Sequence, residues 1–367
     1  MKLICTQENL NKGLNLVSYL ADKNTNLPIL NNVLLKATKN GLTLITTNLE
    51  IGIKVFIRSK IEEEGEFTVD AKLLNNFISL LPKENIEINI KDKILNIKNK
   101  NQEANINGLD AEDFPLIPEI EKENEVEIGA QELKNALNKV VFAASLDNSR
   151  LEINAVNFSF QPKELTLVAT DSYRLTEKKI KINSDKEKNL IIPLKTVQEL
   201  IRVLSEEDNQ KIKVYFNENQ IMFIFNNIEL VSRVIDSKYP DYKQIIPQEF
   251  ITSIRCEVDK LIPIIKSVSL FCKQGINDIN LIFDSKNQKL EVSTTSSSNG
   301  SKDIAKIPVK ITGENNDIVF NFRYLLDGLN HINNKEVIIN INNSKSPGLL
   351  KPEDEQDYIY LIMPIKQ

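Results

Sequence analysis

The chain has 367 residues, of which 41% are hydrophobic and 26% charged, and its formal net charge is −5. This length suits two or three domains rather than one core, and no run of about 18 apolar residues is present to span a membrane. The 11 glycines are too few to favour a nucleotide-binding fold built on glycine loops, and three widely spaced cysteines without a CxxC pair favour buried thiols over disulfides or zinc.

The first third of the chain predicts four elements in order. A helix is expected at 8–20, a strand at 42–53, a second helix from Asp70 and a strand that ends near residue 90. Apolar residues three and four apart indicate the helices, and alternating apolar residues indicate the strands. The start of the chain lacks the apolar segment of a signal peptide, so we expect a cytoplasmic protein.

The same order of elements recurs twice more. Strand segments LTLITTNLEIGI, LTLVATDSYRLT and LEVSTTSSSNGS begin at 42, 165 and 290, with offsets of 165 − 42 = 123 and 290 − 165 = 125. Lys72, Lys195 and Arg323, in register on the second helix of each copy, give 195 − 72 = 123 and 323 − 195 = 128. A period of about 125 residues indicates three related domains.

Each repeat is expected to be an α+β unit of antiparallel strands with two helices on one face. The third copy begins with a helix at Asp259, which would place Pro263 in its first turn, where the missing N–H costs little. Polar segments that contain proline predict the boundaries, which gives domains at 1–122, 123–250 and 251–367.

The middle copy places Asp, Ser, Tyr and Arg at 171–174, which raises the alternative of a hydrolase. A nucleophilic serine needs a nearby base, and neither Lys178 nor His331 has a spacing that identifies it as one. His331, the single histidine, is expected to lie on the surface or to cap a helix end. Since the other copies read TTNLEIG and TTSSSNG, the shared part of this segment is structural.

Several motifs in their order and spacing carry a resemblance to a known family. They are TNLPILNNVLL at 25–35, TTNLEI at 46–51, VATDSYRL at 168–175, KYPDYKQIIP at 238–247 and YIYLIMPIKQ at 358–367. Together they resemble the bacterial DNA polymerase III β subunit, the sliding clamp, over the whole chain. The resemblance implies three tandem clamp domains with sheets outside and two helices per domain lining a channel. It implies a homodimeric ring, joined head to tail, that encircles duplex DNA without sequence preference.

The resemblance further implies a non-catalytic processivity subunit without cofactor or metal. Its partners would be double-stranded DNA, a second copy of the chain, the polymerase III α subunit, the clamp loader δ subunit, and other polymerases or repair proteins. The protein partners would dock through short hydrophobic motifs. A clamp paralogue that serves repair is a further alternative.

Three sets of site residues follow from the matched motifs and the repeat helices. The partner-peptide groove is expected to include Ile153, Thr170, Ser172, Tyr173, Arg174, Leu175, Pro240, Ile245, Leu361, Ile362, Met363, Pro364 and Ile365. DNA-facing cations are expected at Lys12, Lys23, Lys72, Lys134, Lys139, Arg150, Lys195, Arg202, Lys266 and Arg323. The dimer interface is expected to include Ile106, Leu270 and Phe271.

The chain departs from the family pattern inside these sites. Ser172 and Tyr173 stand where the family has Gly and His, and Gln244 replaces an Arg. Glu152 follows Arg150 closely, and its negative charge is expected to weaken a phosphate contact there. The groove is therefore expected to exist while its preferred peptide differs.

Overall fold

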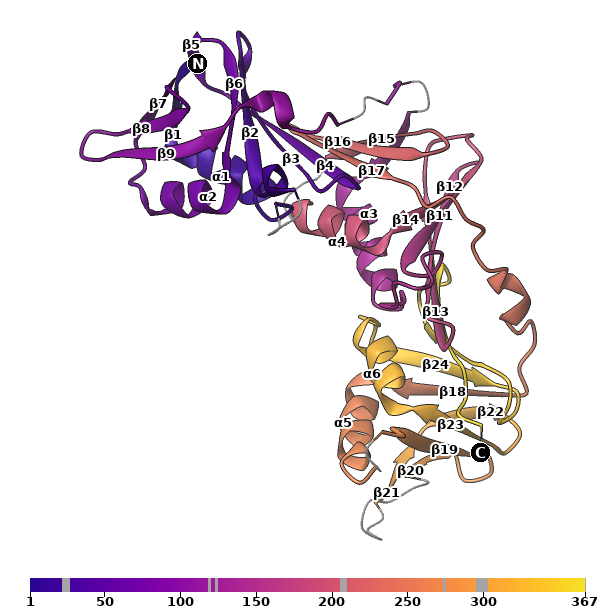
Figure 1. Ribbon diagram of the computed structural model, residues 1–367. Coiled ribbons are helices and arrows are strands. Elements are labelled where there is room, and N and C mark those ends of the chain that lie inside the picture. The colour runs from indigo at the N-terminus through magenta and orange to yellow at the C-terminus, as the bar shows by residue number, and fades with distance from the viewer. Residues whose placement is uncertain are drawn as a thin grey trace. The chain divides into compact units, whose positions relative to one another are not determined.

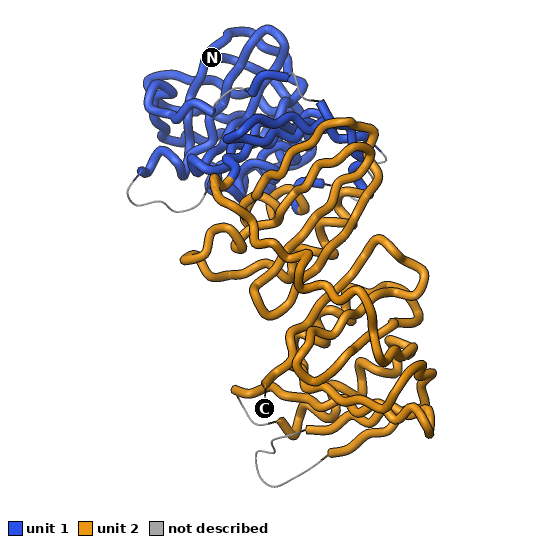
Figure 2. The backbone as a smooth tube through the Cα atoms, turned by 90° about the vertical axis from the view of Figure 1, so that its right-hand side faces the viewer, with its two compact units in different colours: residues 1–131, 202–234 blue, residues 132–201, 235–367 orange. Residues whose placement is uncertain are grey.

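The computed structural model describes residues 1–21, 27–117, 120–122, 125–204, 210–272, 275–294 and 303–366. The chain forms two compact units, coloured separately in Figure 2. The first contains residues 1–131 and 202–234, and the second contains residues 132–201 and 235–367. No helix in the described ranges is long and apolar enough to cross a bilayer.

The first unit is built on one 13-stranded antiparallel sheet, in the order β10-β15-β16-β17-β4-β3-β2-β6-β9-β8-β7-β1-β5. Its strands are β1 (Lys2–Thr6), β2 (Asn32–Thr38), β3 (Gly41–Thr47), β4 (Ile51–Ile57), β5 (Lys60–Glu63), β6 (Gly65–Asp70), β7 (Asn85–Lys91), β8 (Ile94–Lys98), β9 (Glu103–Leu109), β10 (Val126–Gly129), β15 (Lys211–Phe216), β16 (Gln220–Phe225) and β17 (Ile228–Arg233). Two short 3-10 helices, η1 (Pro28–Asn31) and η2 (Ala111–Asp113), also belong to it.

Helices α1 (Gln7–Val17) and α2 (Ala71–Leu80) lie side by side on this sheet (Figure 1). The side chain of Thr6 accepts a hydrogen bond from an amide in the first turn of α1, and Asp70 does the same for α2, so each helix starts at a side-chain cap. Leu10, Leu14 and Val17 form one fully buried face of α1. The apolar spacing in the sequence therefore predicted both helices.

The second unit contains a nine-stranded sheet, β14-β11-β12-β13-β26-β25-β24-β18-β22, and a four-stranded sheet, β21-β20-β19-β23. Its strands are β11 (Ala155–Gln161), β12 (Glu164–Thr170), β13 (Arg174–Lys181), β14 (Lys188–Pro193), β18 (Thr252–Glu257), β19 (Asp278–Asp284), β20 (Lys289–Ser293), β21 (Ile304–Pro308), β22 (Lys310–Gly313), β23 (Asn316–Asn321), β24 (Glu336–Ile341), β25 (Gly348–Pro352) and β26 (Tyr358–Ile362). The 3-10 helix η3 (Tyr242–Ile245) precedes β18.

Helices α3 (Ala130–Val141) and α4 (Leu194–Val203) lie mostly in this unit, and α5 (Val258–Ser269) and α6 (Phe322–Asn330) lie wholly within it. The predicted first-turn position of Pro263 was wrong: α5 begins at Val258, so this proline is its sixth residue. The strand Thr252–Glu257 ends directly before Val258, and that early start places the proline inside the helix.

The α+β class with repeated pairs of helices is confirmed, and Cys5, Cys256 and Cys272 are buried free thiols, as expected. The compact units nevertheless cut through the middle repeat. Strands β10 and β15–β17 belong to the first unit, whereas β11–β14 belong to the second, because β17 pairs with β4 and β13 pairs with β26. The boundaries at 122 and 250 follow the sequence repeat and stay a prediction.

Candidate functional site

The turn between β12 and β13, residues 170–174, has the same hydrogen bonds as the turn between β3 and β4, residues 47–51. The Thr170 hydroxyl donates to the Arg174 carbonyl at 2.6 Å and accepts from the Ser172 amide at 3.1 Å. Thr47 makes the equivalent bonds to the Ile51 carbonyl at 2.8 Å and the Leu49 amide at 3.1 Å. The repeated segment is therefore a shared structural turn, as the sequence comparison indicated.

The third residue of each turn has a left-handed backbone. Ser172 has φ 78° and Leu49 has φ 76°. In both turns the side chain at the second position, Asp171 or Asn48, accepts hydrogen bonds from the backbone amides two and three residues later. These bonds fix a conformation that residues with a side chain rarely adopt.

The polar groups of the middle turn also weaken the hydrolase alternative. The Ser172 hydroxyl accepts a hydrogen bond from Arg150 Nη1 at 2.8 Å, and within the described residues it donates to no base. Both carboxylate oxygens of Asp171 are taken by the turn and by Arg174. A nucleophilic serine would need a base beside its hydroxyl.

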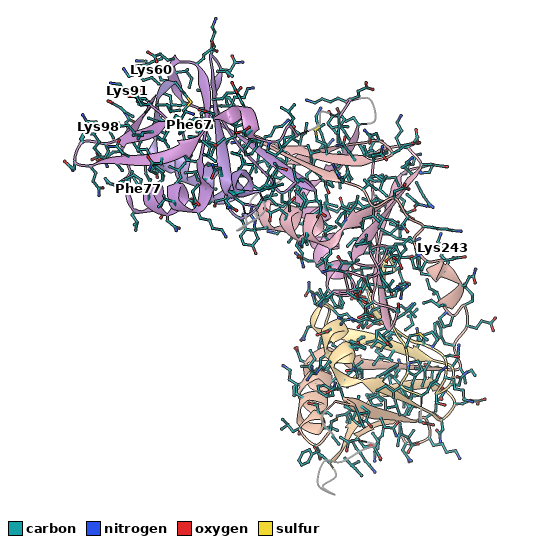
Figure 3. All side chains as sticks on the ribbon, in the orientation of Figure 1. Lys60, Phe67, Phe77, Lys91, Lys98 and Lys243 are labelled. Carbon is teal, nitrogen blue, oxygen red and sulfur yellow. The ribbon has the colours of Figure 1, made fainter. Side chains whose placement is uncertain are left out.

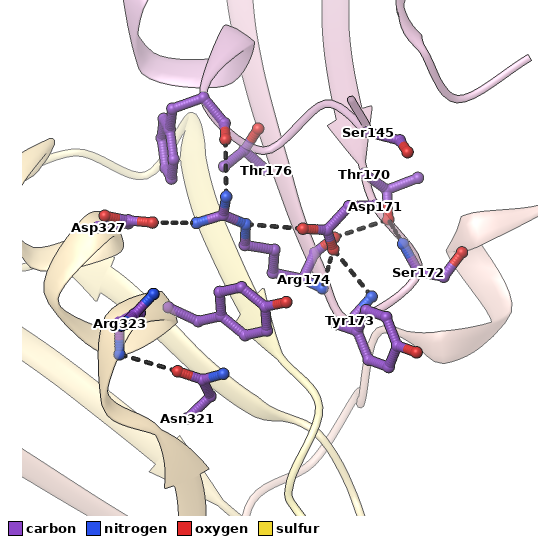
Figure 4. A network of polar contacts seen from close by, with 12 residues as sticks. Ser145, Thr170, Asp171, Ser172, Tyr173, Arg174, Thr176, Asn321, Arg323 and Asp327 are labelled. Carbon is purple, nitrogen blue, oxygen red and sulfur yellow. Dashed lines mark hydrogen bonds and ion pairs between the residues drawn. The ribbon is translucent and has the colours of Figure 1, made fainter. Parts of the chain in front are cut away.

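The guanidinium of Arg174 takes part in a network that joins β13 to α6 and to Phe142, the residue after α3 (Figure 4). Its Nε donates to Asp171 at 3.0 Å, Nη1 to Asp327 at 2.5 Å, and Nη2 to the Phe142 carbonyl at 3.0 Å. The same group lies 4.7 Å from the centroid of the Tyr324 ring. Burial acts to lower the pKa of Arg174, but its anionic neighbours outweigh burial and raise it.

His331 packs against Phe142, next to this network. It is the C-cap of α6, as the sequence predicted, and its ring stacks on the Phe142 ring with centroids 3.8 Å apart. Its Nδ1 lies 2.7 Å from the Asp327 carbonyl oxygen. The single histidine therefore packs at a helix end.

A groove with a cavity volume of about 150 Å³ opens beside the turn. Its floor is apolar, because the β13–β26 pairing sets Leu175 opposite Leu361. Tyr242 on η3 packs on the same cluster, and its hydroxyl donates to Glu177 at 2.6 Å. The lining residues are Arg150, Thr170, Ser172, Arg174, Leu175, Pro240, Asp241, Tyr242, Ile245, Leu361 and Met363.

Eight of the predicted groove residues therefore meet at this cavity: Thr170, Ser172, Arg174, Leu175, Pro240, Ile245, Leu361 and Met363. The other five lie outside its lining. Ile153 and Ile362 are buried, Tyr173 is 62% exposed and stacks on Tyr324, and Pro364 and Ile365 follow along the tail. Asp241 and Tyr242 were missed, although the YPDY motif contains both.

Arg150 was expected to face DNA but lines the groove. Its Nη1 donates to Ser172, and its Nε pairs with Glu152 at 3.1 Å. Glu152 was expected to weaken a phosphate contact of Arg150, and in the structure it forms an ion pair with that residue. No local sequence pattern indicates that residue 150 and residue 172 would meet.

Two other predicted DNA-facing cations have partners inside the protein. Lys139 forms an ion pair with Glu355, which Lys178 contacts at 2.6 Å. Arg202 donates to the Asn15 carbonyl at 3.2 Å and to that of Leu16, at the C-terminal end of α1.

The remaining predicted cations lie on helices and stay a prediction. Lys12, Lys72, Lys195, Lys266 and Arg323 are exposed and Lys134 is half-buried. Lys23 lies outside the described residues. No sequence pattern distinguishes a cation that stays exposed on a helix from one that, like Lys139 or Arg202, contacts a partner inside the protein.

Of the predicted interface residues, Leu270 and Phe271 lie in the second unit and Ile106 lies in the first. Leu270, after α5, is 81% exposed, and Phe271 is half-buried. Ile106 on β9 is 8% exposed and therefore buried, whereas helix α2 of the same unit presents Leu73 and Leu80 at 53% and 84% exposure. Phe77 lies between them on the same helix (Figure 3).

Comparison with known proteins covers the whole chain. Models of the DNA polymerase III beta subunit match residues 1–118 as its N-terminal domain, 127–241 as its central domain and 243–366 as its C-terminal domain. The beta sliding clamp of Synechococcus elongatus is 30% identical over 373 residues, covering 100% of this chain and 99% of the relative.

Two solved structures share the fold over nearly the same extent. The DNA polymerase sliding clamp from Bacillus subtilis superposes with a TM-score of 0.95 at 27% identity, covering 100% of this chain and 99% of that one. A sliding clamp from Pseudomonas aeruginosa bound to griselimycin gives a TM-score of 0.94 at 26% identity, covering 100% of both chains.

Proposed function

This chain belongs to the DNA polymerase III β subunit family, the bacterial sliding clamps, and from that premise we propose that two copies close into a ring around duplex DNA. As a β sliding clamp it is a non-catalytic processivity subunit rather than an enzyme. The ring would act in the cytoplasm and keep the replicative polymerase on its template. The full-length match to sliding clamps carries this proposal.

The exposed apolar surfaces support the dimer. One surface, formed by Leu73 and Leu80 on α2, lies in the first unit, and the other, formed by Leu270 and Ile304, lies in the second. Clustered exposed apolar side chains mark surfaces that are covered in an assembly. A contact between two different surfaces, made twice by two copies, closes into a two-fold ring.

Open strand edges accompany these surfaces. Within the described residues, β21 is the outer strand of its four-stranded sheet and pairs only with β20. Residues 103–107 of β9 pair with β8, whereas its pairing with β6 involves only Gly108 and Leu109. We propose that the partner copy covers these edges, which would protect them from aggregation.

The exposed helix cations would contact DNA phosphates. Lys12, Lys72, Lys195, Lys266 and Arg323 project from five different helices. Phosphate contacts carry no sequence information, so the protein can slide along the duplex. The net charge of −5 does not oppose this, because the position of the cations decides binding.

The groove beside the turn would dock protein partners. We propose the polymerase III α subunit, the clamp loader δ subunit and other polymerases or repair proteins, each through a short hydrophobic motif. Leu175, Leu361 and Ile245 supply an apolar lining, and the flexible thioether of Met363 can repack around different side chains. The griselimycin complex of the Pseudomonas aeruginosa clamp shows that a relative binds a ligand.

Retention on DNA tests the ring. The protein is loaded onto a closed circular plasmid with its cognate loader, the plasmid is linearised in half of the sample, and both are passed through a sizing column at moderate salt. Retention on circles with loss from linear DNA is the expected result, because a ring slides off free ends. Equal retention on both would mean ordinary electrostatic binding, and the topological proposal would fail.

A further inference from the structure

We propose that the first unit contains a second docking site for apolar peptide segments, which the chain closes with its own residue Ile117. The site corresponds, through the sequence repeat, to the groove of the second unit. The inference rests on the proposed role of that groove in docking partners. It concerns a different surface, which lies wholly within residues 1–131 and 202–234.

Strand pairing gives the first unit a surface equivalent to the groove. The turn before β4 and the turn before β13 have the same hydrogen bonds, and Gly52 follows the first turn as Leu175 follows the second. On the neighbouring strand, Val231 lies opposite Gly52 as Leu361 lies opposite Leu175. Gly52 and Val231 therefore stand where the two leucines form the floor of the groove.

Ile117 fills the space that the missing side chain of Gly52 leaves. A Cβ atom at Gly52 would lie 2.5 Å from Cδ1 of Ile117, which is too close for two carbon atoms that are not bonded. Ile117 also packs against the apolar cluster that contains Val231 and against the one that contains Ile45. One side chain from the segment after η2 thus joins two clusters over a position that has no side chain of its own.

The second unit leaves the equivalent space open. There Leu175 and Leu361 line the cavity of about 150 Å³, together with Pro240 and Ile245 from the segment around η3. In the first unit, by contrast, Ile117 packs directly against the equivalent floor. The chain itself therefore supplies an apolar side chain at the place where a partner would supply one in the groove.

An extended segment with adjacent apolar side chains is the ligand class that fits this surface. Its floor is fully apolar, and Leu49, which stands where Ser172 lines the groove, is an apolar residue that is 45% exposed. Ile117 is only partly buried, and its neighbour Leu116 is 95% exposed. Exposed apolar side chains around an apolar floor mark a surface that a further apolar group can cover.

The number of peptides bound per chain tests the proposal. The probe is a hexapeptide that ends in Leu-Phe, titrated into the full-length protein in a calorimeter. The wild type should bind one peptide per chain, and Ile117→Ala should bind two, the second with a dissociation constant within about a hundredfold of the first. Addition of Met363→Ala with removal of residues 365–367, which disables the groove, should leave one peptide per chain bound to the Ile117 variant and none bound to the chain that keeps Ile117.

Two further variants separate an opened site from a loosened fold. Gly52→Leu combined with Ile117→Ala returns apolar volume to the floor at the position of Leu175, so it should fold stably and bind the second peptide more tightly than Ile117→Ala alone. Ile120→Ala is the matched control, because Ile120 belongs to the same cluster as Val231, whereas the atoms nearest to Gly52 belong to Ile117. It should lower Tm as Ile117→Ala does, since both remove apolar volume, and should gain no second site.

The outcomes distinguish this inference from the proposed function. If Ile117→Ala and the double variant unfold cooperatively but still bind one peptide per chain, the second site does not exist and the groove stands. A second site that also appears in Ile120→Ala would overturn the inference as well, because general loosening would then explain the binding. If the wild type binds no peptide at all, the docking function of the groove fails, and with it the basis of this inference.

Discussion

Asp327→Asn tests how far burial strengthens an ion pair. Arg174 Nη1 lies 2.5 Å from Asp327, and Lys93 Nζ lies 2.6 Å from Asp110 at the surface. The contacts are similar in length, but the Arg174 side chain is 12% exposed, whereas that of Lys93 is 70% exposed. Any difference in the unfolding free energy lost with each pair therefore reports the surroundings of that pair.

The expected loss of unfolding free energy in each variant follows from these exposures. Loss of one charge-assisted hydrogen bond costs about 1.5–3 kcal/mol of unfolding free energy, and the 45% exposure of Asp327 places the expected cost at the low end, at about 1.5 kcal/mol. Arg174 keeps Asp171 and the Phe142 carbonyl, so its charge is not left unpaired. Asp110→Asn should cost about 0–0.5 kcal/mol, as exposed pairs do.

Urea unfolding followed by circular dichroism gives both values. Protein concentration is fixed throughout, because dimer formation shifts apparent stability with concentration. The m-value should not change, which would show that the native surface is intact. An Asp327→Asn cost no larger than that of Asp110→Asn would refute the argument that burial makes the Arg174 contact stronger.

Three further predictions concern the dimer, the groove and pH. Leu270→Lys should convert the dimer to monomers in sedimentation velocity, because it places a charge on an apolar side chain that is 81% exposed and proposed to contact the partner copy. A dimer that persists in this variant would show that the surface around Leu270 is not the dimer interface. Met363→Ala with removal of residues 365–367 should abolish the binding of hydrophobic motif peptides, measured by fluorescence anisotropy, and should leave the dimer intact. Loss of the dimer would mean that the C-terminal tail does not belong to the groove. Burial acts to raise the pKa of Glu355, but its lysine partners outweigh burial and lower it from 4.5, so its stabilisation is complete above that pH and is lost as pH falls through the lower folded value. Glu355→Gln should therefore lower Tm at pH 7, and the difference in Tm from wild type should shrink as pH falls below 4.5, whereas a constant difference would contradict the assignment.

The sequence predicted the repeated elements because each depends on local patterning. The turn at Thr47–Ile51 and the turn at Thr170–Arg174 recur with the same hydrogen bonds, and the repeat alone indicated that their common part is structural. Helix caps and hairpins are likewise decided within a few residues.

The contacts that define the site depend on residues far apart in the chain. Arg174 and Asp327 are 153 positions apart, and no local pattern pairs them. Arg150 resembled a DNA-contacting loop residue, yet its contact with Ser172 comes from the way the loop folds against the turn. A basic residue on a predicted surface has the same sequence signature whether it meets a phosphate, a carboxylate or a backbone carbonyl.

The pairing of β17 with β4 has a practical consequence for dissecting the protein. An excised middle repeat would lose that neighbour from β17 and would lose β26 from β13, which exposes two strand edges at once. Unpaired edges of this length template aggregation. The segment that recurs in the sequence is therefore not expected to survive alone in solution. Cuts that respect the sheets would have to fall within α3, near the end of α4 and between residues 234 and 235.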